Sequence, residues 1–122
     1  MSIDTSFYDK KLIYVCSPFS REDNKNIADA RRYCKYVLDH GAVPFAPHLY
    51  FPQLLDESNE EELKTGIGAR LVILAECDEL WAFGDRLTED MRLELELADK
   101  LSMPMRFFSD DCDGEVCPDV RS

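Results

Sequence analysis

Glu94 is the residue whose chemical type and position together favour catalysis most strongly. If residues 87–101 form a helix, successive side chains turn by about 100°. The apolar stripe of that helix then contains Met91, Leu95, Ala98 and Leu101. Glu94 falls inside this stripe, so its carboxylate is directed toward the interior, where ionisable groups often belong to functional sites. The structural alternative is that Glu94 reaches the helix edge or pairs with Arg70 or Arg106.

The loop before this helix, residues 84–90 (GDRLTED), offers groups that bind anions. Thr88 can cap the helix, and the free backbone amides of a helix start attract negative charge. Simple helix capping is the alternative interpretation. Burial would raise the pKa of Glu94 and the helix start would lower it, so the sequence leaves that balance open.

Other motifs carry weaker signals. Residues 65–70 (TGIGAR) contain G-x-G without a third glycine and follow helical sequence, so they do not predict a dinucleotide loop. Cys16 and His48 could form a thiol–imidazole pair, but no third group that would orient them is evident. Cys112 and Cys117 form one C-x₄-C pair, which does not predict a metal site without a second pair.

Alternating strand-like and helix-like segments would position these groups. Runs rich in β-branched and aromatic residues predict strands at residues 11–16, 42–46, 78–83 and 104–108. Helical spacing of apolar residues predicts helices from Ser20 to Gly41, at residues 59–75 and at residues 87–102. Residues 47–59 predict a loop, and Pro44 predicts an edge position for the second strand. The pattern predicts an α/β fold with a mostly parallel sheet of four to five strands, covered on both faces.

Parallel sheets of this kind bind ligands at the carboxyl ends of their strands. The loops predicted at those ends are residues 17–23 (SPFSRED), 47–53 (PHLYFPQ) and 84–90 (GDRLTED). Glu94 follows the third loop, so we expect it to face the ligand site.

The composition of the whole chain narrows the functional classes. With 122 residues, of which 45% are hydrophobic and 32% charged, the chain fits one globular domain. We assign residues 1–10 to an N-terminal extension, residues 11–108 to the domain and residues 109–122 to an acidic tail. A net charge of −11 argues against binding of polymeric nucleic acid or an anionic membrane. The absence of a signal-peptide pattern or a long apolar run predicts a soluble, cytoplasmic protein.

Five segments between residues 11 and 108 share an order and spacing with a known group of proteins. They are IYVCSPFS, NIADARRYC, GAVPFAPHLYFPQLL, CDELWAFG and the T-x-x-M-x-x-E-L arrangement of residues 88–95. Together they resemble uncharacterised small domains of the nucleoside 2-deoxyribosyltransferase-like superfamily. The resemblance implies a flavodoxin-like (Rossmann-like) three-layer sandwich. It also implies an N-glycosidase or deoxyribosyltransferase that cleaves the N-glycosidic bond of a nucleotide or nucleoside.

The resemblance implies roles for individual residues as well. Glu94 matches the glutamate that attacks the anomeric carbon and forms a covalent glycosyl-enzyme. Asp78 matches an acidic position used around the nucleobase, with a strand-entry residue that caps a turn as the alternative. Thr88 falls where related monophosphate glycosidases bind phosphate, and Ser17 and Arg21 could join it. The implied substrate-binding residues are Ser17, Pro18, Phe19, Arg21, His48, Gly84, Thr88, Asp90 and Met91.

Asp90 departs from the superfamily pattern, which usually has glycine at this position. A carboxylate there would repel a phosphate, so the alternative function is a non-catalytic nucleotide-binding or interaction module with the same fold. The implied chemistry needs neither a metal nor a cofactor. The resemblance further implies a small-molecule nucleoside or nucleotide as the partner, and self-association as a dimer or higher homo-oligomer.

Overall fold

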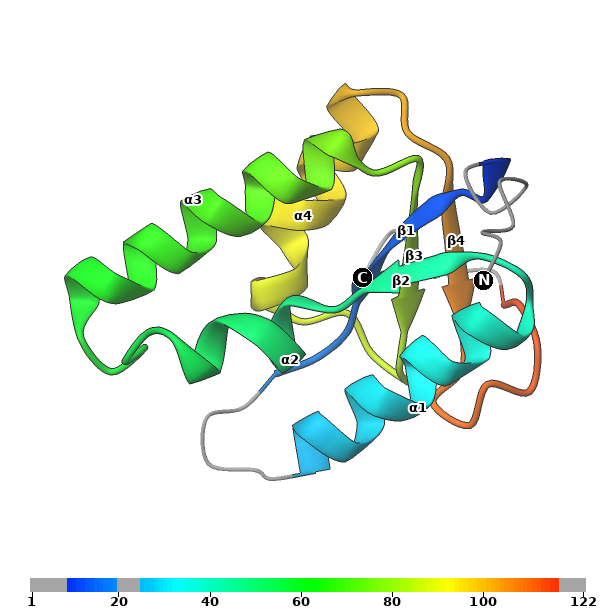
Figure 1. Cartoon of the computed structure of the whole chain (residues 1–122), viewed down its shortest axis with the longest axis horizontal. Helices are drawn as coiled ribbons and strands as arrows, with labels where there is room; N and C mark the ends of the chain where they lie inside the picture. Colours follow the sequence, from blue (N-terminus) through cyan, green and yellow to red (C-terminus); the bar gives the residue numbers. More distant parts are fainter. Residues whose placement is uncertain (1–8, 20–24, 117–122) are drawn as a thin grey trace, which may run out of the picture.

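Four parallel strands form the centre of the molecule (Figure 1). The computed structural model describes residues 9–19 and 25–116. Its strands are β1 (Leu12–Cys16), β2 (Val43–Phe45), β3 (Glu79–Phe83) and β4 (Met105–Phe108). They lie in the order β2-β1-β3-β4, and each of the three pairings is parallel. The predicted α/β fold is therefore confirmed, and Pro44 lies in an outer strand, as expected.

Helices cover both faces of this sheet. They are α1 (Lys25–Asp39), the short α2 (Pro47–Tyr50) followed by the 3₁₀ turn η2 (Phe51–Gln53), α3 (Glu60–Glu76) and α4 (Glu89–Lys100). In Figure 1, α1 lies on one side of the sheet, whereas α3 and α4 lie on the other. This arrangement is the flavodoxin-like three-layer sandwich. Within the described ranges, no helix is long and apolar enough to cross a membrane.

Successive residues of β1 point into two different cores. Ile13 and Val15 pack with Tyr33 of α1 on one face of the sheet. Tyr14 and Cys16 pack on the other face, with side chains of α3 and α4. Because both faces are buried, the strands lack the alternation of apolar and polar residues that marks a half-exposed sheet. The hydroxyl of Tyr14 is consequently carried into the layer that holds α3 and α4.

The burial of α4 confirms the orientation predicted for Glu94. Met91, Glu94 and Ala98 are 1%, 4% and 0% exposed. Leu101, which the spacing places in the same stripe, is instead 48% exposed. The helix ends before this residue and the backbone turns at Ser102, whose φ is 55°, so Leu101 leaves the helical spacing.

Residues 47–53 are helical where the sequence predicts a loop. Pro47 occupies the first turn of α2, where its missing N–H and fixed φ are tolerated. The Leu54 amide donates to the carbonyl of Phe51 at 2.9 Å, and Phe51 itself is 6% exposed. A four-residue helix is too short to show an apolar repeat, which explains why the spacing did not reveal it.

The described part of the predicted acidic tail folds back on the sheet. Glu115 forms an antiparallel bridge with Phe108, and its carboxylate pairs with Arg106 at 2.9 Å. The amide of Val116 donates to the carbonyl of Phe107 at 2.7 Å. Residues 109–116 therefore belong to the folded unit.

Candidate functional site

Glu94 lies where α4, α3 and β1 meet, toward the carboxyl end of the sheet. A loop joins the carboxyl end of β3 to α4, and Glu94 occupies the second turn of that helix. Its Oε1 is 3.9 Å from the Nε of Arg70 on α3. Tyr14 and Cys16 of β1 are its electrostatic neighbours on the strand side. The pairing with Arg70 was one of the structural alternatives open at the sequence level.

The surroundings of Glu94 shift its pKa to about 7, from an ordinary value of 4.5. Burial is the largest cause, because it disfavours the charged carboxylate. The positive charge of Arg70 opposes that shift, with smaller contributions from Cys16 and Tyr14, while the carboxylate of Asp90 adds to it. Near neutral pH, Glu94 therefore exists in both its charged and its protonated form.

In the described part of the chain, two of the three buried polar atoms without a hydrogen bond belong to neighbours of this carboxylate. Among the described residues, the buried polar atoms without a hydrogen-bond partner are the Tyr14 hydroxyl, Arg70 Nε and Thr88 Oγ1. Such atoms are rare because each costs about 1–3 kcal/mol. Tyr14 and Arg70 act directly on Glu94, and Thr88 precedes α4 without capping it through its side chain. Each of these atoms has hydrogen-bonding capacity that the described residues do not use.

The segment after β1 is held in place by His48 of α2. The Nε2–H of His48 donates to the carbonyl of Ser17 at 2.9 Å, and the His48 ring stacks on Phe19 with a centroid distance of 4.4 Å. Burial lowers the pKa of His48 below its usual 6.5, so the imidazole is neutral at pH 7. His48 is 5% exposed. The buried His48 ring therefore fixes the positions of Ser17, through the hydrogen bond, and Phe19, through ring stacking.

Gly84 and Pro18 bring the loops after β3 and β1 into close contact. Gly84 has a φ of +117°, and a Cβ at this position would lie 3.0 Å from Cδ of Pro18. A residue with a side chain would strain the backbone and displace the proline ring. Two of the residues implied by the resemblance are thus packed against each other.

Two hollows flank residues 18–19. The larger, of about 670 Å³, is lined by Phe19 together with residues of η2 and of the connection to α3. The smaller, of about 350 Å³, is lined by Pro18, Gly84 and mainly polar residues of α1 and of the loops after β3 and β4. The larger hollow falls within the usual size range of small-molecule sites.

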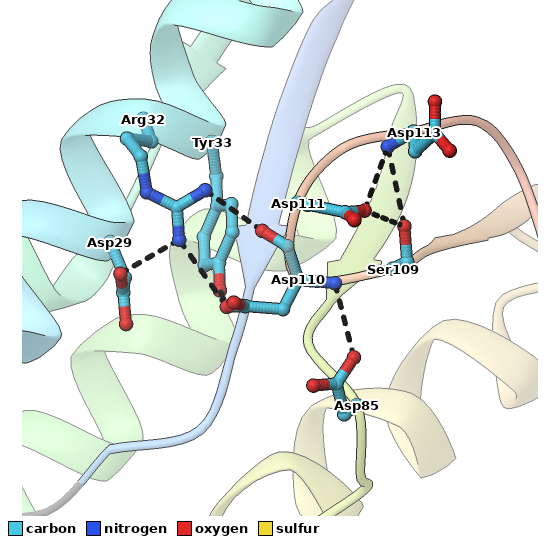
Figure 2. Close-up of polar contacts among 8 residues, drawn as sticks. All are labelled: Asp29, Arg32, Tyr33, Asp85, Ser109, Asp110, Asp111 and Asp113. Carbon is cyan, nitrogen blue, oxygen red and sulfur yellow. Dashed lines mark hydrogen bonds and ion pairs between the residues drawn. The ribbon is translucent and has the colours of Figure 1, made fainter.

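Carboxylates form one wall of the smaller hollow, and Figure 2 shows how they are held. The Tyr33 hydroxyl donates to Oδ1 of Asp110 at 2.6 Å, and Arg32 donates to the Asp110 carbonyl at 2.8 Å. The Asp110 amide donates to Asp85 at 3.4 Å. Asp29 lines the same hollow, so its acidic wall disfavours an anionic group. In residues 9–19 and 25–116, no group of three or more His, Cys, Asp or Glu side chains could hold a metal ion.

The structure does not bring every implied site residue to Glu94. Asp78 lies at the amino end of β3, where it accepts the amide of Leu12 at 2.7 Å. Because β1 and β3 are parallel, that end of the sheet is opposite to the start of α4, and the strand-entry alternative fits Asp78 better than a role beside the base. Met91 belongs to the core rather than to the surface of a site. Arg21 lies outside the described residues.

From the sequence, Arg70 is expected only as a structural partner of Glu94, and Tyr14 is not expected near the site. Arg70 follows Ile67 by three residues and precedes Leu74 by four, so it falls in the apolar stripe of α3 as Glu94 does in α4. A second charge inside an apolar stripe was therefore the available signal. Tyr14 carries no such signal, because an aromatic residue is ordinary core in a strand buried on both faces.

Comparisons with known proteins agree with this architecture. The 2-deoxyribosyltransferase from the psychrotolerant bacterium Bacillus psychrosaccharolyticus matches with a TM-score of 0.63 and 23% identity, over 88% of this chain and 77% of that chain. A conserved protein from Enterococcus faecalis V583 matches with a TM-score of 0.55 and 18% identity, over 81% of this chain and 63% of that chain. The chain thus has the nucleoside 2-deoxyribosyltransferase-like fold.

Sequence comparison adds a domain family. A family model described as "Domain of unknown function (DUF7768)" matches residues 11–108. Comparison with curated proteins gives no significant match.

Proposed function

Because this chain belongs to the family of DUF7768 domains, whose description names no activity, we propose a function from the site itself. The protein cleaves the N-glycosidic bond of a nucleoside or nucleotide, with Glu94 as the nucleophile. The observation that carries this proposal is a carboxylate that is 4% exposed, has a pKa of about 7 and adjoins two buried polar atoms without a hydrogen bond, the Tyr14 hydroxyl and Arg70 Nε. Such perturbed, incompletely satisfied groups concentrate at functional sites.

The reaction divides into two displacements at the anomeric carbon. A Glu94 oxygen bonds to that carbon while the carbon–nitrogen bond breaks, and the base leaves with the bonding electrons and takes up a proton from water. The sugar is then an ester of Glu94. A water molecule or a second nucleobase then attacks the same carbon, loses a proton to solvent and releases the carboxylate. Attack by water gives hydrolysis, and attack by a second nucleobase gives transfer.

The pKa of Glu94 and the linings of the two hollows suit these steps. The carboxylate must be charged to attack, and a pKa of about 7 leaves a charged fraction at neutral pH. Phe19 offers an aromatic face at the edge of the larger hollow, and nucleobases stack well on aromatic rings. Any phosphate on the substrate would avoid the acidic wall around Asp110.

Release of free base from a panel of ribo- and deoxyribonucleosides and their 5′-monophosphates tests the proposal. We expect turnover with at least one member, and a loss of about 10³-fold or more in Glu94→Gln, because the nucleophile is gone. Glu96→Gln is the matched control, since Glu96 is an exposed carboxylate of the same helix. Addition of a second free base separates transfer from hydrolysis. No turnover above that of Glu94→Gln across the whole panel would refute the proposal.

Trapping the intermediate provides a second readout. After acid quenching during turnover, the mass of the intact protein should rise by that of the attached glycosyl group. Peptide analysis should place this increase on the peptide that contains Glu94. Glu94→Gln should show no such increase, because its amide cannot form the ester.

A second candidate function is nucleotide binding without catalysis. The observation that favours it is Asp90, an exposed carboxylate at the start of α4 that disfavours the charged form of Glu94 and would repel a phosphate there. A binding module would be stabilised thermally by its ligand but would release no base. The same panel, followed by thermal unfolding, separates the two candidates.

A further inference from the structure

A pair of opposite charges joins α3 to α4 inside the molecule. The side chains of Arg70 and Glu94 are 12% and 5% exposed, and the Arg70 Nε lies 3.9 Å from the Glu94 Oε1. Each charge stands in the apolar stripe of its own helix, where neither would be stable without the other. We propose that Arg70 is a positioning residue that keeps the Glu94 carboxylate charged in surroundings that favour its neutral form. The catalytic consequence of this role rests on the proposed function, but the role itself does not.

The geometry leaves the carboxylate available to react. A separation of 3.9 Å is too long for a hydrogen bond, and Arg70 Nε has no other hydrogen-bond partner among the described residues. Through this nitrogen, Arg70 therefore attracts Glu94 by charge and does not occupy an oxygen lone pair. A direct hydrogen bond would stabilise the carboxylate more, but it would also weaken it as a nucleophile.

Among residues 9–19 and 25–116, the other groups that face Glu94 cannot replace this charge. From β1, burial raises the pKa values of Tyr14 and Cys16, so both are neutral and bring no charge to Glu94. From α4, Asp90 is a carboxylate and works against the charged form of Glu94. From α2, His48 is neutral because burial lowers its pKa. Arg70 on α3 is the cation that opposes the cost of burying the charge.

Titration of Glu94 in the absence of substrate tests the proposal directly. The carboxyl carbons of all glutamates are labelled and followed by NMR across the pH range, and Glu94→Gln identifies the signal of interest. We expect a midpoint near 7 in the wild type. In Arg70→Gln it should rise by about one unit or more, because an opposite charge at this range shifts a pKa by about 1–3 units. Lys64→Gln removes an exposed charge from the same helix and should leave the midpoint unchanged.

Arg70→Lys keeps the charge and covers the case in which Arg70→Gln fails to fold. We expect its Glu94 midpoint to remain within about half a unit of the wild-type value. A rise of a full unit in Arg70→Lys, or an unchanged midpoint in a folded Arg70→Gln, would overturn the proposal. If a substrate is found, the acidic limb of kcat/KM should move with the NMR midpoint. If none is found, the titration still decides the role of Arg70, so the failure of one proposal is distinguishable from that of the other.

Discussion

Two buried glutamates among the described residues show how surroundings divide carboxylates by role. Burial raises the pKa of Glu94 to about 7. Burial would also raise the pKa of Glu79, but hydrogen bonds from Lys11 and the Trp81 indole outweigh it and lower the pKa. Glu79 is thus stabilised as a charged group and ties β3 to the start of β1. Glu94 is held in a state that is unfavourable for stability and useful for chemistry.

We expect Glu94→Gln to flatten the pH dependence of the free energy of unfolding between pH 4.5 and 7. In this window the folded protein keeps the Glu94 proton that the unfolded chain releases, so the wild-type free energy of unfolding falls as the pH rises. The full loss is up to about 3 kcal/mol. Urea unfolding of both proteins at several pH values measures it. A difference between the two that is constant across the window would contradict the buried, raised-pKa state of Glu94.

At the scale of elements, the site depends on where α4 and the loops after β1 and β3 meet. Residues that are far apart in sequence, such as Pro18 and Gly84, touch because parallel strands end at the same edge of the sheet. His48 then holds the β1 loop from α2, a helix of only four residues. The direction of the strands therefore determines where the site lies, and the contacts between the loops determine its shape.

Two glycine substitutions test how much the close contact between the loops after β1 and β3 contributes to stability. Gly84→Ala should lower the free energy of unfolding by about 1–3 kcal/mol, because φ is +117° and the new Cβ would meet Pro18 at 3.0 Å. Gly68→Ala in α3 meets nothing within 4 Å and should raise it by about 0.5–1 kcal/mol, through helix propensity. Thermal and urea unfolding of both variants check this. Equal effects in the two variants would show that the close contact of the loops does not matter.

Secondary structure could be predicted from the sequence where a segment is long enough to show one apolar pattern. It could not be predicted where tertiary packing determines the local conformation. The strands followed from runs of β-branched and aromatic residues, and the long helices and the buried position of Glu94 followed from apolar spacing. The spacing did not reveal residues 47–53, because a short helix stabilised by buried Pro47 and Phe51 has no repeat. The resemblance implied a role for Asp78 around the nucleobase, but strand direction puts that residue at the opposite end of the sheet.

At the scale of the whole molecule, the segment after β4 joins the last strand to the first helix. Asp110 receives hydrogen bonds from Arg32 and Tyr33 of α1, and Glu115 bridges to β4 (Figure 2 shows the first of these contacts). The tie crosses from the last strand to the first helix. It lies beyond residue 108, where the family match ends.

A chain that ends at Phe108 should be less stable than the full chain by about 2 kcal/mol or more, because it leaves the Tyr33 hydroxyl and the Arg32 guanidinium without these partners. A chain that ends at Val116 keeps both contacts and is the matched control. Urea unfolding of the two shortened chains gives the difference. Similar stability would mean that the tie to Asp110 contributes little.

The contact between Tyr33 and Asp110 also bears on how this domain varies in evolution. A hydroxyl that is 2.6 Å from its acceptor and otherwise packed against the core is useful only while that acceptor is present. In a relative whose chain stops near position 108, or that carries an apolar residue at position 110, phenylalanine serves better than tyrosine at position 33. Positions 33 and 110 should therefore change together in evolution. The residue at position 33 of α1 would then indicate whether the domain of a relative extends past position 108.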